Sequence, residues 1–346
     1  MNPQRAQDLL SRCAGRRVLL LGDLMMDEWV FGSVKRISPE APIPVVTMPL
    51  TPEARAHKPG GAGNVAAILL GLGAVVRTVG VVGDDDYGRR LLADLAARGT
   101  DTSGVVTDPS RPTTHKLRII AGRQQLLRID TERDAPLDAG MCARLQEGVR
   151  AGLDQADVIL VSDYAKGVVA EGSLPAGLIG QARRSGTPFC ADPKPANIHL
   201  FRGASLVSPN EAEALQAAGS SVNGGANPNA AHLHSQPAPV FAAGWSLLQS
   251  LDAEAVFITR GDKGIAVFGP ENAFAEVPAL TGSGDVGDAT GCGDAVSAAS
   301  ALALAAGATY LEAAEMGNAA GGVVSRFVGV HSPSPDEIVE RLSRAR

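Results

Sequence analysis

Short apolar runs alternate with longer amphipathic stretches along most of this chain. Residues 18–21 are apolar at every position and end at Gly22-Asp23, so they predict a buried strand. Residues 295–306 are rich in alanine and leucine and predict a buried helix. Further strands are predicted at 75–82, 158–161, 189–191, 206–207 and 256–259, and helices at 65–72, 87–98 and 174–184. This alternation predicts an α/β fold with helices on both faces of a mostly parallel sheet, and the length allows one large domain with an appendage or two ordinary domains.

Two separated sections have a different texture, with β-prone pieces and no helical period. Residues 29–51 carry prolines at 39, 42, 44 and 49, and residues 117–130 hold two strand-like runs around Ala121-Gly122. We expect them to form a small β appendage. A third section, 220–239, is rich in Asn, Gly, Pro, Ser and Ala and predicts a surface insertion. Because His232 and His234 have no further ligand set beside them, we expect no metal site there.

Composition excludes several classes of protein. The 346 residues are 45% hydrophobic, enough for a sizeable core, and carry a net charge of −6 without a long basic run, so we expect no nucleic-acid partner. The apolar stretches are too short to span a bilayer, and charges interrupt residues 1–17, so neither a membrane association nor a signal peptide is expected. The four cysteines lack metal-ligand or disulfide spacing. These features predict a cytoplasmic location.

The segment Asp288-Ala289-Thr290-Gly291-Cys292-Gly293-Asp294 carries the most chemistry. A Gly-X-Gly turn that opens a helix leaves backbone N–H groups free at the positive end of the helix dipole, which favours anion binding. Asp294 would repel a phosphate held there, so it makes sense if it accepts a proton from a hydroxyl that attacks the phosphate. The alternative is an ordinary acidic residue in a first helical turn.

Other motifs also allow two interpretations. Gly60-Gly61-Ala62-Gly63-Asn64 could let a ligand approach the backbone, or form a glycine-rich turn with Asn64 as helix cap. Asn210 and Glu213 could be a capping box or a water-mediated Mg²⁺ anchor. The segment 282–287 matches the GxGxxG dinucleotide fingerprint outside its usual βαβ context, and no Walker A motif occurs. The β sections contain cations that could be a solvated face or suit a phosphorylated substrate: Lys35, Arg36, Lys116, Arg118, Arg123 and Arg128.

Taken in order, these motifs resemble the ribokinase-like, PfkB-type carbohydrate kinases. The segments that carry the resemblance are 22–27, Gly60 to Asn64 and Asp288 to Asp294, supported by 83–88, Asn210 to Glu213 and 259–264. The resemblance implies a single domain over 1–346 with a three-layer α/β/α fold and a β lid at 29–56 and 113–131. Within the family, segments 36–45, 124–130, 162–167 and 192–194 are similar to D-glycero-D-manno-heptose 7-phosphate kinases, which act on the anomeric 1-hydroxyl on the way to ADP-heptose. In many of those enzymes a nucleotidyltransferase domain follows, and we expect no room for one within these 346 residues.

The resemblance implies a role for each matching residue. Asp294 would be the base, and the N–H groups of Gly291, Cys292 and Gly293 would hold the transferring phosphoryl group. The implied sugar contacts are Asp27, Gly60, Gly61, Asn64, Arg118, Asp163 and Lys166. The implied nucleotide contacts are Lys194, Asn210, Glu213, Thr259, Arg260, Gly261 and Asn318, with Glu213 holding Mg²⁺ through water. The implied ligands are ATP, Mg²⁺ and a phosphosugar, with room for a monovalent cation such as K⁺, and the lid would mediate a homodimer.

Some residues depart from the family pattern. Ala289 and Cys292 replace two residues of the usual turn, and a small side chain at 292 should leave the backbone donors intact. Gly63, where alanine is usual, and the 220–239 insertion bear on the substrate rather than on the fold. Three alternatives therefore stay open: another kinase of this family acting on ribose, fructose or a nucleoside, a non-catalytic sugar or nucleotide sensor, and a dinucleotide-dependent dehydrogenase.

Overall fold

The structure is a computed structural model that describes residues 1–122, 124–222, 239–280, 289–327 and 329–344. Outside these ranges lie most of the predicted insertion, including His232 and His234, together with Arg123, the segment 282–287 and Asp288. The two ends of the insertion lie in helices α6 (Glu211–Val222) and α7 (Pro239–Ser250).

A large sheet forms the centre of the molecule, and its described strands lie in the order β14-β13-β12-β11-β10-β9-β1-β5-β6. β1 (Arg17–Gly22) is parallel to both of its neighbours, β9 (Val158–Ser162) and β5 (Val75–Gly83). All neighbouring pairs along the order β6-β5-β1-β9-β10-β11-β12 are parallel. At the β12 edge, β13 and β14 are added as antiparallel strands. The remaining strands are β6 (Asp101–Asp108), β10 (Phe189–Asp192), β11 (Leu206–Val207), β12 (Ala255–Thr259), β13 (Ile265–Phe268) and β14 (Phe274–Val277). The predicted mostly parallel sheet is confirmed.

Each face of this sheet carries its own core. Val18 and Leu20 of β1 belong to one buried cluster, whereas Leu19 and Leu21 belong to the other. A strand covered on both faces must be apolar throughout, which explains the unbroken run at 18–21. The helices that pack on the face of Val18 and Leu20 are α1 (Pro3–Cys13), α2 (Ala62–Gly71), α3 (Asp86–Ala97), α8 (Cys292–Ala305), α9 (Tyr310–Val324) and α10 (Pro335–Ser343). The helices that pack on the face of Leu19 and Leu21 are α4 (Ala139–Leu153), α5 (Leu178–Ser185), α6 and α7. Helices on both faces are thus confirmed.

One predicted helix boundary is wrong. The helix expected over 174–184 begins only at Leu178, because its N-cap Gly177 has a left-handed φ of 75° that interrupts a helix. Among the described helices, none has the length and apolar character needed to cross a membrane.

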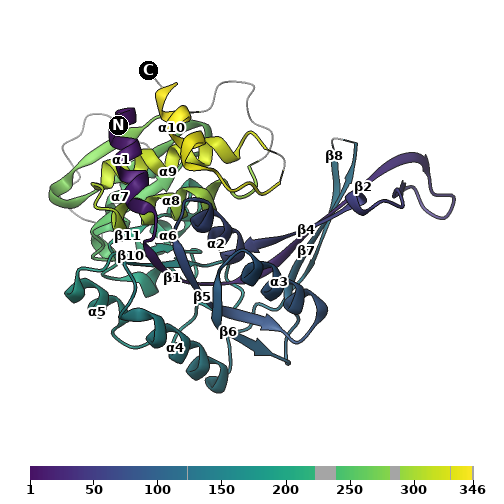
Figure 1. The fold of residues 1–346 in the computed structure, drawn as a ribbon, viewed down its shortest axis with the longest axis horizontal. Helices are drawn as coiled ribbons and strands as arrows, with labels where there is room; N and C mark the ends of the chain where they lie inside the picture. Colours follow the sequence, from purple (N-terminus) through teal and green to yellow (C-terminus); the bar gives the residue numbers. More distant parts are fainter. Residues whose placement is uncertain (123, 223–238, 281–288, 328, 345–346) are drawn as a thin grey trace.

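A small sheet projects from one end of the molecule (Figure 1). Its strands are β2 (Leu24–Ile37), β3 (Pro44–Thr47), β4 (Arg55–Gly61), β7 (Thr114–Ala121) and β8 (Gln124–Thr131). The sections expected to form a lid, 29–56 and 113–131, fall on these strands, while β2 and β4 continue beyond them to Leu24 and Gly61. Only Asp23 separates β1 from β2, so the chain passes directly from the large sheet into the small one.

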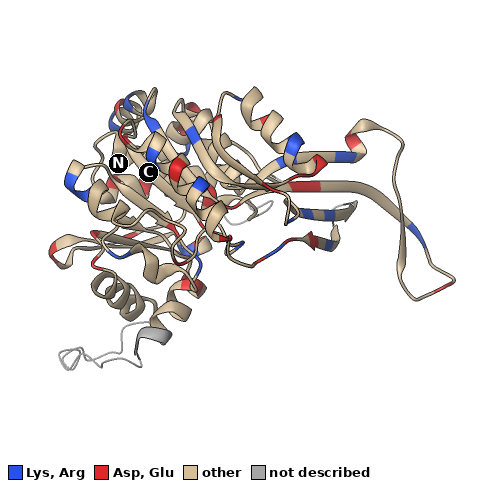
Figure 2. Cartoon of the chain, turned by 90° about the horizontal axis from the view of Figure 1, so that it is seen from below, with Lys and Arg blue, Asp and Glu red and all other residues tan. Residues whose placement is uncertain are grey.

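The two faces of the small sheet differ in character. Directly opposed pairs on β7 and β8 are Lys116 with Asp130, Leu117 with Ile129, Arg118 with Arg128, and Ile119 with Leu127. Because successive residues of a strand point to opposite faces, one face is charged and the other is apolar. Figure 2 shows positive and negative residues interspersed along the projecting strands. On the apolar face, Leu127 is 52% exposed and Ile129 is 46% exposed.

Candidate active site

The first turns of two helices meet at the carboxyl end of the large sheet. α2 begins after Gly61, which has φ 55°, and α8 begins after Gly291, which has φ 79°. A Cβ atom at Gly291 would lie 2.9 Å from the side-chain nitrogen of Asn64, and one at Gly61 would lie 2.5 Å from the carbonyl oxygen of Asp23. Glycine is therefore favoured at both positions, because it adopts a positive φ easily and because it leaves room for the neighbouring Asp23 carbonyl and Asn64 side chain.

Asp294 is the carboxylate at this meeting point. The Asn64 Nδ2 group donates to its Oδ2 at 2.7 Å, and the Tyr164 hydroxyl donates to its Oδ1 at 2.7 Å. Only 4% of Asp294 is exposed, and burial raises its pKa to about 6, against the opposing effect of the two hydrogen bonds. A carboxylate with that pKa is ionised near neutral pH and can accept a proton.

The N-terminus of α8 is suited to hold an anion. No side chain caps it, and the first N–H groups of a helix have no partner within the helix. The Cys292 N–H donates to the Ala289 carbonyl at 3.3 Å, which leaves the N–H groups of Gly293 and Asp294 as the next donors of that turn. Gly293 lines two pockets. A Cβ atom added there would meet no atom of the described residues within 4 Å, apart from its chain neighbours and the backbone of its own helix.

The first pocket, of about 210 Å³, is polar. Its lining includes Asp294, Asp192, Lys194 and Glu213. Burial raises the pKa of Asp192 to about 7, and the Ser297 hydroxyl donates to this carboxylate at 2.9 Å. Lys194 Nζ lies 2.5 Å from Glu213 Oε1. Among the described residues, no three or more His, Cys, Asp or Glu side chains gather in a group that could hold a metal ion.

Glu213 has a second role in this pocket. Its carboxylate accepts from the Asn210 N–H at 2.9 Å, while the Asn210 side chain accepts from the Glu213 N–H at 2.9 Å. These reciprocal bonds form a capping box at the start of α6, in agreement with the structural interpretation of this motif. The same carboxylate pairs with Lys194, so the structural and the ligand-binding interpretations of Glu213 are compatible.

The second pocket, of about 330 Å³, is mainly apolar and shares Gly293 and Thr259 with the first. Gly261 and Asn318 also line it, and the Asn318 side chain donates to the Pro278 carbonyl at 2.8 Å. Arg260 does not line either pocket, unlike Thr259 and Gly261 on each side of it. Its guanidinium group instead pairs with Glu276 on β14 at 2.6 Å.

Asp27 extends the site toward the small sheet. Arg118 Nη1 lies 2.5 Å from Asp27 Oδ1, and the Arg118 guanidinium stacks over the Trp29 ring at 4.9 Å. A Cβ atom at Gly60 would lie 2.2 Å from Asp27 Oδ2, so the absence of a side chain at Gly60 leaves room for this carboxylate. Asp27 is 4% exposed.

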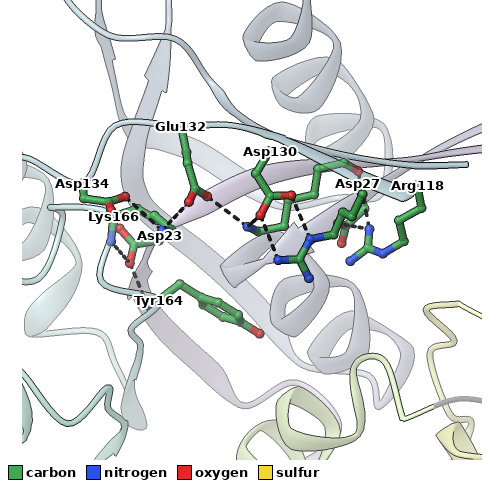
Figure 3. Close-up of polar contacts among 10 residues, drawn as sticks. Asp23, Asp27, Arg118, Asp130, Glu132, Asp134, Tyr164 and Lys166 are labelled. Carbon is green, nitrogen blue, oxygen red and sulfur yellow. Dashed lines mark hydrogen bonds and ion pairs between the residues drawn. The ribbon is translucent and has the colours of Figure 1, made fainter. Parts of the chain in front are cut away.

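A series of ion pairs continues from this point across the charged face of the small sheet (Figure 3). Asp130 pairs with Arg128 at 2.8 Å and with Lys116 at 3.1 Å. Glu132 then bridges Lys116 at 2.9 Å and Lys166 at 2.8 Å. Lys166 also pairs with Asp134 at 2.9 Å, so these contacts join the small sheet to the loop after β9.

Two buried carboxylates shape that loop. Asp23 accepts from the N–H groups of Tyr164 at 2.7 Å and of Lys166 at 3.2 Å, and burial raises its pKa to about 6. Asp163 accepts from the Lys194 N–H at 2.9 Å and from the Asn197 side chain at 3.0 Å. Burial likewise raises the pKa of Asp163. The contacts of Asp163 in the structure therefore position the backbone of Lys194.

The structure brings together Asp27, Asn64, Lys194, Glu213 and Asp294, which the sequence had indicated separately. Sequence reasoning assigned no role in the site to Tyr164, and it noted Asp23 only as the residue after the first strand and Asp192 only within segment 192–194. The available signal was that each lies at or just beyond the end of a parallel strand, where ligands of such sheets bind.

Comparison with known proteins gives consistent matches. A model of the pfkB family carbohydrate kinases matches residues 30–337. The chain is 37% identical over 339 residues to the bifunctional protein HldE of Geobacter metallireducens, covering 98% of this chain and 65% of that protein. With the bifunctional protein HldE of Pelobacter propionicus the identity is 36% over 345 residues, covering 100% and 67%. This chain thus spans about two thirds of the length of these relatives. The fold is similar to that of phosphofructokinase-2 from Escherichia coli, with a TM-score of 0.75 at 22% identity, covering 96% of this chain and 100% of that one.

Proposed function

The chain belongs to the pfkB family of carbohydrate kinases, and we propose that it transfers the γ-phosphoryl group of ATP to the anomeric 1-hydroxyl of D-glycero-D-manno-heptose 7-phosphate, on the pathway to ADP-heptose. The position of Asp294 is the observation that most directly supports a kinase activity. This buried carboxylate stands in the first turn of an uncapped helix, on the wall of a polar pocket that adjoins an apolar one.

The proposed reaction is a direct transfer without a covalent enzyme intermediate. The sugar hydroxyl oxygen attacks the γ-phosphorus in line with its bond to the bridging oxygen of ADP. That bond breaks, ADP leaves with the electron pair, and the hydroxyl proton passes to Asp294. The N–H groups of Gly291, Gly293 and Asp294 stabilise the charge on the transferring group, whereas the Cys292 N–H is bonded to the Ala289 carbonyl. One such donor contributes about 2.7–4 kcal/mol in comparable oxyanion holes.

The two pockets divide ATP between them. The apolar pocket suits the base, and the polar pocket suits the phosphates. Lys194 would contact a phosphate, and Glu213, already paired with Lys194, would reach Mg²⁺ through water. Mg²⁺ keeps several waters and needs few protein carboxylates. By the family resemblance, a monovalent cation such as K⁺ is also part of the proposed ligand set.

The charged face of the small sheet supports a phosphorylated acceptor. Lys116, Arg118 and Arg128 lie on this face, each paired with a carboxylate. A sugar phosphate can exchange with those carboxylates, so cations are available without being left unpaired in the free enzyme. Further support for heptose 7-phosphate comes from the motifs at 36–45, 124–130, 162–167 and 192–194 and from the match to HldE proteins along nearly the whole chain. In this proposal the small sheet is the lid over the sugar.

The opposite, apolar face of the small sheet supports a homodimer. Leu127 and Ile129 are about half exposed on β8, and Ile37 on β2 is 60% exposed. Exposed apolar side chains grouped on one sheet face are typical of a protein interface. A second copy of the chain presents the same face, which fits a symmetric dimer.

A substrate panel with ATP and Mg²⁺ tests the proposed function. ADP formation would be measured with heptose 7-phosphate, unphosphorylated heptose, ribose, fructose and a nucleoside. We expect kcat/KM for heptose 7-phosphate to exceed that for unphosphorylated heptose by at least about 100-fold, because the unphosphorylated sugar lacks the phosphate that would bind the cations of the small sheet. We also expect Asp294→Asn to lower kcat by about 100- to 10,000-fold with nearly unchanged KM values.

Asp157→Asn serves as the control, because Asp157 lies just before β9 and pairs with Arg17 at the amino ends of the parallel strands, at the opposite end of these strands from the site. Preference for an unphosphorylated sugar would favour another kinase of the family. Binding of sugar and ATP without any ADP formation would favour the sensor, and near-normal turnover of Asp294→Asn would remove Asp294 from the mechanism.

A further inference from the structure

Tyr164 lies between the acceptor side and the nucleotide side of the site. Its hydroxyl donates to Asp294 Oδ1 at 2.7 Å, and Lys194 Nζ lies 5.2 Å from the centre of its ring. Its own N–H is fixed by Asp23 at 2.7 Å, at the point where the chain leaves the large sheet. The tyrosine is therefore held at its backbone and at its hydroxyl, and it touches the polar pocket.

The carboxylate of Asp294 has one fixed donor on each oxygen. Tyr164 approaches Oδ1 from the loop after β9, and Asn64 approaches Oδ2 from the first turn of α2. Each carboxylate oxygen has two lone pairs, so this arrangement fixes the plane of the group and leaves one lone pair on each oxygen for a further partner. An ionised carboxylate needs such donors, because burial without them favours the protonated form.

We propose that Tyr164 is a positioning residue for Asp294: its hydroxyl, together with the Asn64 amide, orients the carboxylate and keeps it ionised to receive the proton of the sugar hydroxyl. This inference rests on the proposed kinase activity. Tyr164 acts through Asp294 and takes no proton itself, since burial and the adjacent Asp294 hold the pKa of its hydroxyl well above the usual value.

Several charged groups also face Asp294. Asp27 on β2 and Asp192 on β10 add negative charge near it, whereas Lys194 adds positive charge. Burial raises the pKa of Asp294 to about 6, and the bonds from Asn64 and Tyr164 lower it. Removal of the Tyr164 hydroxyl takes away one lowering effect and leaves the other groups in place. The pKa of Asp294 then rises, and the base becomes protonated at a higher pH.

The first test compares the pH dependence of kcat for the wild type, Tyr164→Phe and Tyr310→Phe. Tyr310 is a matched control, because its hydroxyl donates to a carboxylate, Glu254, at the same distance of 2.7 Å, outside the pockets of the site. For Tyr164→Phe we expect the acidic limb of the profile to move up by about one pH unit, the effect of losing one hydrogen bond to a charged group. Above that limb kcat should stay within about threefold of wild type, with KM values unchanged. Tyr310→Phe should match the wild type throughout.

The second test keeps the hydroxyl and the full side-chain volume at position 164. The chain contains only 3 tyrosines, so Tyr87→Phe with Tyr310→Phe leaves Tyr164 alone to carry 3-fluorotyrosine. The fluorinated phenol is a stronger donor, and the acidic limb should move to lower pH. Its single ¹⁹F resonance should titrate with Asp294 near pH 6, and Asp294→Asn should abolish this titration.

These results separate the inference from the proposed function. An active wild-type kinase whose acidic limb is unmoved by both Tyr164→Phe and fluorination would overturn the positioning role and leave the kinase proposal intact. A ¹⁹F resonance that titrates equally in Asp294→Asn would also overturn it. If Tyr164→Phe fails to fold, the fluorotyrosine protein still decides. Absence of kinase activity in the wild type would defeat the proposed function, while the ¹⁹F titration would still report on the contact.

Discussion

At the scale of single residues, Gly293 is the position where helix stability and ligand space conflict. It is the second residue of α8, where alanine would favour the helix, and a Cβ atom there would meet no atom of the rest of the described chain within 4 Å. The fold thus gives no reason for glycine, whereas the two pockets that Gly293 lines do give one. A phosphate bound by the backbone of this turn would need that space.

We therefore expect Gly293→Ala to raise the free energy of unfolding by about 0.5–1 kcal/mol. The added methyl group should at the same time raise the KM for ATP by about 10-fold or more, since it enters the space next to the N–H donors. Urea unfolding and steady-state kinetics measure the two effects.

Gly219→Ala is the control for Gly293→Ala. Gly219 lies within α6, and a Cβ atom there also meets no atom within 4 Å in the part of the chain that the structure describes, outside its own helix. It should give a similar gain in stability with unchanged kinetics. If Gly293→Ala binds ATP as tightly as the wild type, the nucleotide phosphates do not contact this turn.

At the scale of elements, the described helices contain several capping boxes, and one of them faces the site. Thr309 with Glu312 caps α9, and Ser334 with Glu337 caps α10. Asn210 with Glu213 caps α6, where the acid also pairs with Lys194. Glutamine can replace glutamate in a capping box, because its side-chain oxygen accepts the same bond. The charge of Glu213 can therefore be tested apart from its structural role.

Glu213→Gln should change the free energy of unfolding by less than about 0.5 kcal/mol, because the cap persists. The Mg²⁺ concentration for half-maximal activity should rise by about 10-fold, since the neutral amide is a weaker partner for the ion and its waters. A titration of activity with Mg²⁺ at fixed ATP measures this change.

Glu337→Gln, in the box that caps α10, should leave both quantities unchanged. An unchanged Mg²⁺ requirement in Glu213→Gln would mean that Glu213 acts only as a helix cap and as the partner of Lys194.

How far the sequence predicts these elements depends on what sets their pattern. β1 and α8 were predictable, because burial on both faces or on all sides makes them continuously apolar. α9 gave no such signal, since it is built largely from alanine and glycine without a polar period. In the site, glycine turns predicted the places of Asn64 and Asp294, but the bond between them joins residues 230 positions apart. Tyr164 was missed because the position of its hydroxyl next to Asp294 depends on the conformation of the loop after β9. That conformation is fixed by the bond from the Tyr164 N–H to Asp23, which the sequence pattern does not reveal.

At the scale of the whole molecule, the small sheet projects from the body (Figure 1). Leu127 and Ile129 are about half exposed on its apolar face. We expect the wild type to sediment as a dimer and Leu127→Asp with Ile129→Asp to sediment as a monomer. Two buried charges facing each other across a symmetric interface cost far more than the interface can compensate. Analytical ultracentrifugation at several protein concentrations measures the change.

Leu311→Asp is the control for this interface, because Leu311 is a similarly exposed leucine, on α9, away from the small sheet. It should leave the dimer intact. A monomeric wild type, or a dimer that survives both aspartates on β8, would place the subunit contact elsewhere or remove it.

The way the small sheet is assembled has a consequence for biosynthesis. β2 emerges from the ribosome soon after β1, yet its parallel partner β7 lies beyond β5, α3 and β6 in the chain. Until β7 and β8 are translated, β2 can pair only with β3 and β4, and the edge that β7 later covers is open to pairing with another nascent chain. A nascent chain that ends before Thr114 would therefore be prone to aggregate through this unpaired strand edge. We expect chaperones that bind nascent chains to protect it most during that interval of synthesis.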